Sequence, residues 1–69
     1  MRYAMIIETG KQNYSAYLPD LPGCVATGST LEEVRERMQE AIELHLAGMR
    51  EDGVPIPKPT TLADYIEAA

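Results

Sequence analysis

The stretch PDLPGCVATGSTLEE, residues 19–33, decides how this chain folds. Pro19 and Pro22 each fix φ near −65° and lack a backbone N–H donor, which predicts a stiff, extended crossing after a strand. Gly23 and Gly28 bracket a short apolar segment, at points where the chain turns sharply or another backbone approaches closely. Such dense punctuation predicts a strand, a rigid turn and a second strand that leads directly into a helix.

The helix that follows has clear start and stop signals. Thr30-x-x-Glu33 has the form of a capping box, in which a hydroxyl and a carboxylate each accept from an unpaired backbone amide. Apolar residues then recur at spacings of three and four, which predicts an amphipathic helix from Leu31 to Arg50. Gly53 and Pro55 predict its end.

Two further strands are predicted upstream. Residues 2 to 8 are rich in β-branched and aromatic side chains, and apolar residues on both sides of this strand suggest a central or doubly covered position. A hairpin loop at Thr9–Asn13 leads to a second strand at Tyr14–Leu18, and Cys24–Thr27 is the third. The predicted fold class is α+β: a three-stranded antiparallel sheet with one long helix packed on one face.

The C-terminal part contains two different patterns. Alternating prolines in VPIPKP predict an extended strap that returns over the domain. The segment LADYIEAA that follows has a helical composition, with Leu62, Tyr65 and Ile66 at i, i+3 and i+4. It predicts a short C-terminal helical segment.

Length and composition limit the possible stabilising devices. Sixty-nine residues form a single domain, 1–69, with a marginal core. Cys24 is the only cysteine and His45 the only histidine, so no disulfide within the chain, no metal site and no cofactor are expected. Association is the remaining route to stability, which predicts either a homo-oligomer, a dimer or higher, or an obligate partner.

The formal charge of −5 disfavours direct nucleic-acid binding, because that binding depends on Lys and Arg contacts to phosphates. It favours a basic protein partner. No signal peptide and no membrane span are recognised, so we expect a soluble, cytoplasmic protein in a reducing compartment.

No catalytic constellation emerges, and we predict that the chain is not an enzyme. The carboxylates near the turn lie at a helix start or on its polar face, where they complement the helix dipole and face water. Cys24 is predicted to be a packed residue and His45 a packed or helix-capping residue, and no nucleotide-binding glycine motif occurs. A binding surface therefore remains, for which the partner contact candidates are Tyr17, Asp20, Leu21 and Glu36. A purely structural crossover is an equally open interpretation of the turn.

The order of these features resembles the HicB-like antitoxins of bacterial and archaeal toxin–antitoxin systems. The resemblance rests on PDLPGC at residues 19–24, GSTLEE at 28–33, the acidic helix and GVPIPKP at 53–59. It implies a partial ribonuclease-H-like fold and binding to a small basic HicA-type toxin, an mRNA interferase whose active surface the antitoxin occludes.

Many family members continue beyond the proline strap into a fourth strand and a DNA-binding module. Because the sequence stops at Ala69, no separate DNA-binding domain is expected.

Three functional hypotheses follow. The leading hypothesis is a toxin-neutralising module. The alternative is a freestanding structural or regulatory homo-oligomer without a cognate toxin, and a minimal nuclease is a third interpretation from fold analogy alone.

Overall fold

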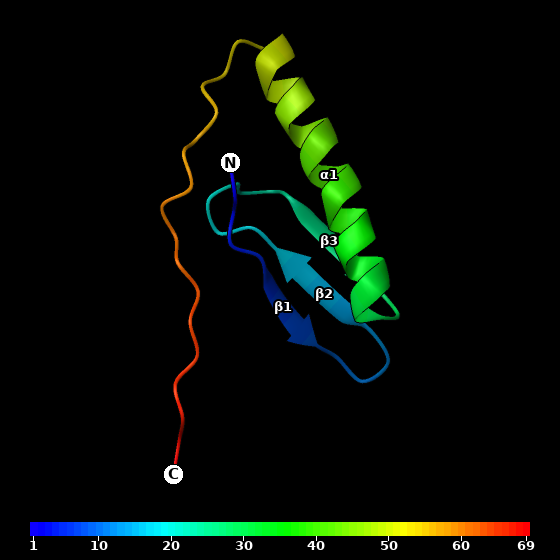
Figure 1. The fold of residues 1–69 in the computed structure, drawn as a ribbon. Coiled ribbons are helices and arrows are strands. Elements are labelled where there is room, and N and C mark those ends of the chain that lie inside the picture. Colours follow the sequence, from blue (N-terminus) through cyan, green and yellow to red (C-terminus); the bar gives the residue numbers. More distant parts are fainter.

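Three short strands and one long helix make up the regular structure of the computed structural model, which describes all 69 residues (Figure 1). The strands are β1 (Ile6–Thr9), β2 (Tyr14–Tyr17) and β3 (Val25–Gly28), and the helix is α1 (Leu31–Glu51). The strands form an antiparallel sheet in the order β1-β2-β3, and α1 packs against β2 and β3. The predicted α+β class and the single helix on one sheet face are confirmed.

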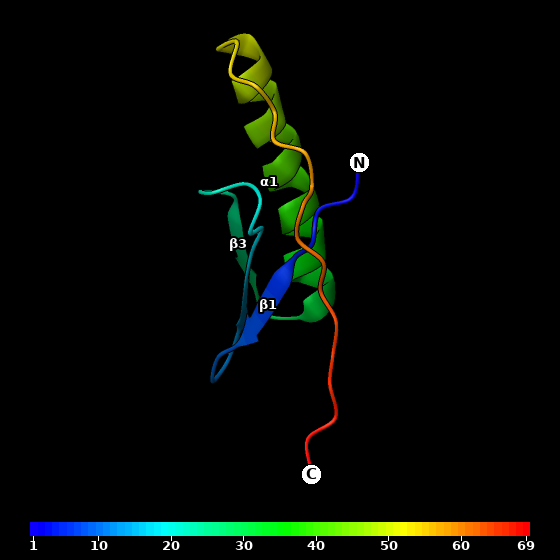
Figure 2. The same cartoon turned by 90° about the vertical axis from the view of Figure 1, so that its left-hand side faces the viewer.

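The core lies between α1 and the sheet. Successive residues of a strand point to opposite faces, so Ala16 of β2 faces the helix and its neighbour Tyr17 faces away. Figure 2 shows the sheet and α1 as two layers. Six hydrophobic residues are buried in the core: Ala16, Leu18, Leu21, Cys24, Val34 and Met38.

Two consecutive turns connect β2 to β3, where the sequence predicted an extended crossing. The Leu21 amide donates to the Leu18 carbonyl (3.1 Å), and the Cys24 amide donates to the Leu21 carbonyl (3.1 Å). Each proline occupies the second position of its turn, which its fixed φ favours. Gly23 has φ +88°, the left-handed conformation that the third position of a type II turn requires. The extended crossing was therefore wrong, because the prolines begin turns here.

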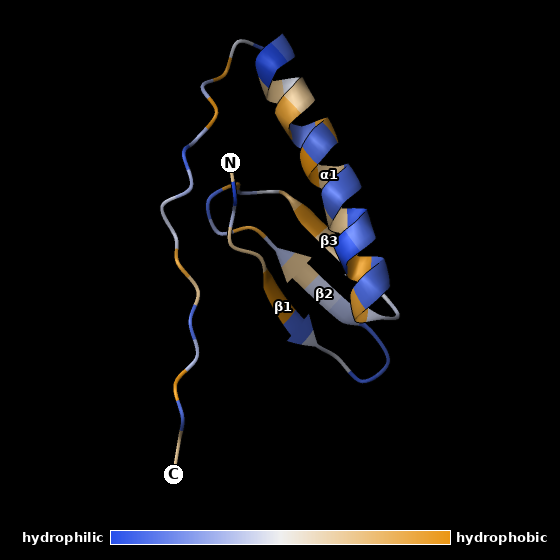
Figure 3. Cartoon of the chain, in the orientation of Figure 1, coloured by the Kyte–Doolittle hydropathy of each residue, from blue (hydrophilic) through white to orange (hydrophobic).

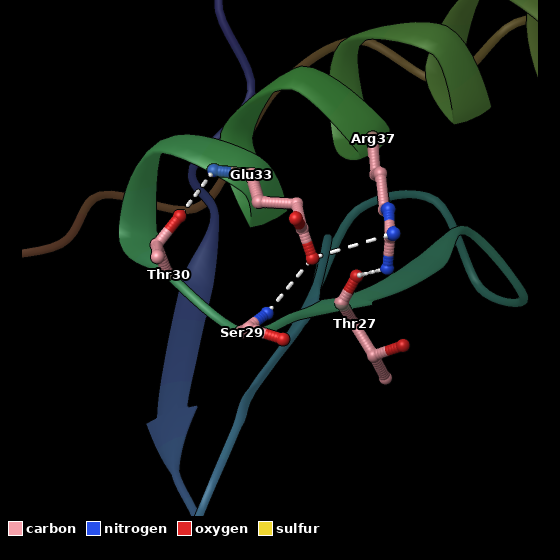
Figure 4. A network of polar contacts seen from close by, with 5 residues as sticks. All are labelled: Thr27, Ser29, Thr30, Glu33 and Arg37. Carbon is pink, nitrogen blue, oxygen red and sulfur yellow. Dashed lines mark hydrogen bonds and ion pairs between the residues drawn. The ribbon is translucent and has the colours of Figure 1, made fainter.

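The start of α1 is a polar network that also joins the helix to β3 (Figure 4). The Glu33 amide donates to Thr30 Oγ1 (3.0 Å), while Glu33 Oε1 accepts from the Ser29 amide (2.9 Å). Arg37 pairs with the same carboxylate (3.3 Å) and donates to the Thr27 carbonyl (2.9 Å). The capping box is confirmed in substance, with the carboxylate reaching one residue further back than the standard form.

A glycine at each end of α1 allows a backbone arrangement that other residues would disfavour. A Cβ on Gly28 would lie 2.8 Å from the backbone nitrogen of Val34, so the last residue of β3 lets the helix approach the sheet. At the other end Gly53 has φ +70°, and the Val54 amide donates to the Met49 carbonyl (2.9 Å). This six-residue closure is the Schellman motif, and it confirms the predicted helix stop.

Two expectations about the ends of the chain are wrong. Residues 62–69 form no helix, because eight residues are too few for an isolated helix and nothing covers their apolar side chains. The first strand begins at Ile6 and is an edge strand, whereas the sequence suggested a strand starting near residue 2 in a central or doubly covered position. Tyr3 and Met5 still pack against the core from the segment that precedes β1.

Candidate functional site

One face of the sheet has no helix on it and carries an apolar row. Ile6 lies opposite Tyr17, and Tyr17 lies opposite Val25, so the three side chains line up across the three strands on the face away from α1. The next row on this face is polar and consists of Glu8, Ser15 and Thr27. We call these six residues the open sheet face. Tyr17 is 41% exposed and Val25 is 64% exposed, which leaves the apolar row accessible to a partner.

The outward side of α1 carries a second surface of a different kind. Four exposed glutamates follow one another at spacings of four, four and three, which brings them onto one side of a helix. We call them the acidic stripe: Glu32, Glu36, Glu40 and Glu43. The only ion pair of the chain joins Arg37 to Glu33, so none of the four has a cationic partner. A spacing of four residues corresponds to about 6 Å along the helix, so the stripe is a regular line of negative charges.

These two surfaces lie on opposite sides of the molecule. Tyr17 points away from the layer that α1 forms, whereas Glu36 points away from the buried residues Val34 and Met38 of the helix. Figure 3 shows hydrophilic residues along the length of α1. Of the four contact candidates, the structure therefore separates Tyr17 from Glu36.

Asp20 has a different environment from the one that the sequence suggested. Its carboxylate accepts four hydrogen bonds from the end of the C-terminal strap, which in the structure extends from residue 54 to residue 61. The donors are the amides of Thr60 (2.9 Å) and Thr61 (2.9 Å) and their hydroxyls (3.1 and 2.7 Å). We call this set the Asp20 clamp. A further bond runs from the Tyr3 hydroxyl to the Pro57 carbonyl. Together they hold the strap against the strand side of the domain, so Asp20 is a fixing point of the fold.

The clamp also shifts an acid–base equilibrium. The hydrogen bond from the Thr61 amide, followed by those from the Thr61 hydroxyl and from Thr60, lowers the pKa of Asp20 from 3.8 to about 2. All of these donors stabilise the ionised carboxylate. A group with a lowered pKa stays charged at neutral pH, which suits an anchor and is unsuitable for a general acid.

Leu21 does not project from the turn as expected. It is only 1% exposed and is one of the two largest fully buried side chains of the domain, so it contributes to the core. Cys24 is buried as well, with its sulfur 3.8 Å from that of Met38, and burial raises the pKa of its thiol. A raised pKa opposes thiolate formation. The interpretation of Cys24 as a small packed hydrophobe is confirmed.

The residues that sequence reasoning missed are the partners of Asp20. Thr60 and Thr61 lie 40 and 41 positions further along the chain, so local patterns carry no sign of the contact. A possible signal is the pair of adjacent threonines directly after the prolines, since Ser and Thr hydroxyls commonly bind nearby carboxylates. Arg37 was also missed, although its i, i+4 spacing from Glu33 is a recognised pairing distance.

The fold defines a small α+β module with two exposed faces of different chemistry, the apolar row of the sheet and the acidic stripe. α1 lacks the apolar length that a membrane crossing requires. The sequence matches the family of HicB-like antitoxins of bacterial toxin–antitoxin systems over residues 3–69, and the chain belongs to that family. Membership of an antitoxin family favours a non-enzymatic, regulatory role.

The chain is also similar to curated proteins of other organisms. The chain is 39% identical over 66 residues to an uncharacterized protein of Haemophilus phage HP1, with 96% of this chain and 50% of that protein covered. The chain thus spans about half the length of the phage relative. A UPF0150 protein of Archaeoglobus fulgidus is 43% identical over 47 residues, with 67% and 68% of the two chains covered.

A solved structure titled HicA3 and HicB3 toxin-antitoxin complex contains a chain of the same fold. The TM-score is 0.73 at 27% sequence identity, and the match covers 86% of this chain and 69% of that one. This structural similarity supports the antitoxin assignment alongside the sequence family.

Proposed function

We propose that this chain is an antitoxin module that binds a basic HicA-type toxin and covers its RNA-cleaving surface. The observation that carries the proposal is the acidic stripe in a chain of the HicB-like family. An enzyme that cleaves RNA needs a cationic surface for the phosphates. A regular line of carboxylates without a cationic partner offers that surface an alternative set of negative charges, so the stripe competes with RNA for the same contacts.

The proposal is supported by the charge balance and the similar complex. A net charge of −5 increases the rate of encounter with a cationic protein. The similar solved chain comes from a structure titled as a complex of HicA3 with HicB3. We further propose that residues 1–69 act as one binding module, without a DNA-binding part among them, inside the cytoplasm where a toxin meets its mRNA.

Glu36 and Tyr17 are the proposed contact residues for two competing docking geometries. Glu36 lies within the acidic stripe, and Tyr17 is the centre of the apolar row on the open sheet face. A toxin that docks on the stripe depends on charge and is weakened by salt, since exposed charges are screened within about 8 Å at physiological ionic strength. A toxin that docks on the open sheet face depends on buried aromatic area and responds little to salt.

The test is a pair of substitutions in one assay. The chain is mixed with the product of the small basic reading frame next to its gene, and the dissociation constant and RNA cleavage are measured at low and high salt. We expect Glu36→Lys to weaken binding by about tenfold at low salt and to restore cleavage. Tyr17→Asp serves as the comparison for the opposite face.

Each result decides between the alternatives. Loss of binding with Tyr17→Asp alone would place the toxin on the open sheet face. Absence of any complex, with cleavage undiminished by the parent chain, would refute the antitoxin proposal. The alternative function, a freestanding homo-oligomer, is favoured by the small core: 7 of 69 residues are buried, and several large hydrophobic side chains are exposed.

A further inference from the structure

A groove lies between the segment that precedes β1 and the neighbouring side of α1. Its volume is about 450 Å³, and six of its nine lining residues are hydrophobic. Its floor includes Leu18 and Met38, which are each 4% exposed and belong to the core. The helix packs against β2 and β3 but not against β1 (Figure 1). The space beside α1, where β1 begins, is therefore left unfilled.

Methionines supply much of the apolar surface of this groove. Three of the four methionines of the chain line it: Met1, Met5 and Met38. A methionine side chain is unbranched and has a polarisable sulfur, so it adapts to apolar ligands of varied shape. Sites for small molecules typically have volumes of about 300–1,000 Å³ and a mostly apolar lining. The groove thus has the size and the lining of a site for a small apolar ligand.

The polar residues of the groove are all neutral or basic. They are Arg2, Arg35 and Gln39, and no acidic residue lines the groove. The chain has 11 acidic and 6 basic residues, so a surface patch of average composition would contain more carboxylates than basic groups. This groove instead holds a third of the basic residues and none of the acidic ones. It is a cationic site in an anionic protein.

Neither arginine of the groove has a carboxylate partner within the chain. The only ion pair joins Arg37 to Glu33. Glu32 precedes Arg35 by three positions on α1, a spacing at which a pair can form, yet the structure has no such pair. Arg2 and Arg35 are exposed, whereas the floor is buried, so their guanidinium groups lie at the mouth of the groove.

This arrangement of charge and apolar surface defines the chemistry of the ligand. An apolar chain would lie on the floor, and an anionic group at its end would meet the arginines at the mouth. A guanidinium group binds a carboxylate through two parallel N–H donors. Because the chain and the charged group of such a molecule lie at opposite ends, both contacts can form at the same time.

The acidic surroundings of the groove favour a small ligand over an acidic protein or a membrane. Glu36 follows Arg35 directly on α1, and Glu32 lies one turn before it. Both belong to the acidic stripe, so a large acidic surface that approached the groove would also meet these carboxylates and be repelled. An anionic bilayer would be repelled in the same way. A small anion contacts only the groove itself.

We propose that this groove is a binding site for a free carboxylic acid of the fatty-acid type, with one carboxylate and an unbranched apolar chain. The floor supplies the affinity for the chain, and Arg2 and Arg35 select an anionic end group. The site shares no residue with the acidic stripe or with the open sheet face. It is therefore additional to the proposed toxin contacts.

The test is a titration of the full chain with octanoate and decanoate, followed by the amide NMR resonances, at concentrations below those at which micelles form. We expect the resonances that shift to cluster around the groove, at Tyr3, Met5 and Ile42 among others. Each added methylene should tighten binding by about fourfold. Octanol, which is uncharged, and octyltrimethylammonium, which is cationic, should each bind at least about fivefold more weakly than octanoate.

Substitution of the arginines tests the selectivity for an anion. Arg35→Gln and Arg2→Gln should each weaken octanoate binding by about fivefold, because each removes one ion pair at the mouth. Arg50→Gln is the matched control: it makes the same change in net charge at an exposed position of α1 that does not line the groove. All three side chains are exposed, so circular dichroism and melting should remain unchanged.

Four results would overturn the inference. They are the absence of any shift with either acid, equal binding of octyltrimethylammonium, equal weakening by Arg50→Gln and Arg35→Gln, and binding to phosphatidylglycerol vesicles without binding of the soluble acids. The last result would indicate a membrane surface in place of a small-molecule site. None of these measurements uses a toxin, so their outcome is independent of the proposed antitoxin function.

Discussion

Replacement of Leu21 by alanine tests whether the proline turn closes the core or serves as a contact surface. Leu21 is 1% exposed, so truncation removes three buried carbons worth about 0.8 kcal/mol each, or about 2.4 kcal/mol. Incomplete relaxation of the cavity brings the expected loss of unfolding free energy to about 3 kcal/mol. This loss is a large part of the total stability of a domain of this length, which is about 3–10 kcal/mol. At about 4–8 °C per kcal/mol, the melting temperature should fall by about 12–24 °C.

The assay is urea unfolding, followed by the far-ultraviolet circular dichroism of α1. Leu44→Ala is the matched control, because it truncates the same side chain where it is 76% exposed, and it should change stability by less than about 0.5 kcal/mol. Toxin affinity of Leu21→Ala, measured well below its melting temperature, should equal that of the parent chain. A loss of less than about 1 kcal/mol, or a folded variant that no longer binds, would refute the core assignment of Leu21.

The remaining predictions concern the clamp, the helix start and the thiol. Because the pKa of Asp20 is lowered to about 2, the clamp contributes fully above pH 3.8 and is lost as the pH falls towards 2; the Thr61 amide resonance should therefore titrate with a midpoint near 2, and a midpoint near 3.8 would disprove the clamp. Thr30→Ala should lower the unfolding free energy by about 1 kcal/mol, and Thr30→Ser should restore it, as judged by urea unfolding. Gly28→Ala should cost about 1–3 kcal/mol in the same assay, because the new Cβ would lie 2.8 Å from a backbone nitrogen of α1; an unchanged midpoint would contradict the close approach. Cys24 should react with a thiol reagent only as fast as the domain opens, and rapid reaction of the native chain would show that it is not buried.

Local signals were sufficient to predict the number and order of the strands and the helix, although β1 begins later than expected and is an edge strand. The Thr30 cap and the Gly53 stop act within one helical turn, so their residues alone set the limits of α1 to within one position. The hairpin and the short connection to β3 left little choice of topology, and the antiparallel meander was predicted correctly. What failed was the shape of the turn at Pro19–Cys24, because prolines are compatible with both an extended path and two successive turns.

The candidate site was harder to predict, because contacts between residues far apart in the sequence decide which candidates are exposed and which are buried. Tyr17 could be placed on a sheet face, yet nothing local showed whether that face or the other would receive the helix. Leu21 was assigned to the surface, and only the packing of α1 against the turn reveals its burial. Residues 62–69 do have a helical composition, but a helix of eight residues needs a surface on which to bury its apolar face, and in the structure these residues are exposed.

The acidic residues show why net charge alone says little about where a partner binds. The carboxylate of Asp20 is occupied by the strap, and that of Glu33 by the helix cap and Arg37. Both are held by donors of the same chain, so neither is freely available to a cationic partner. The four carboxylates of the acidic stripe have no cationic partner and are exposed, and they lie in one line on one element. The net charge of −5 is thus a sum over ionised residues with different roles. A basic partner gains most from the exposed glutamates of the acidic stripe, because no cation of the chain already neutralises them.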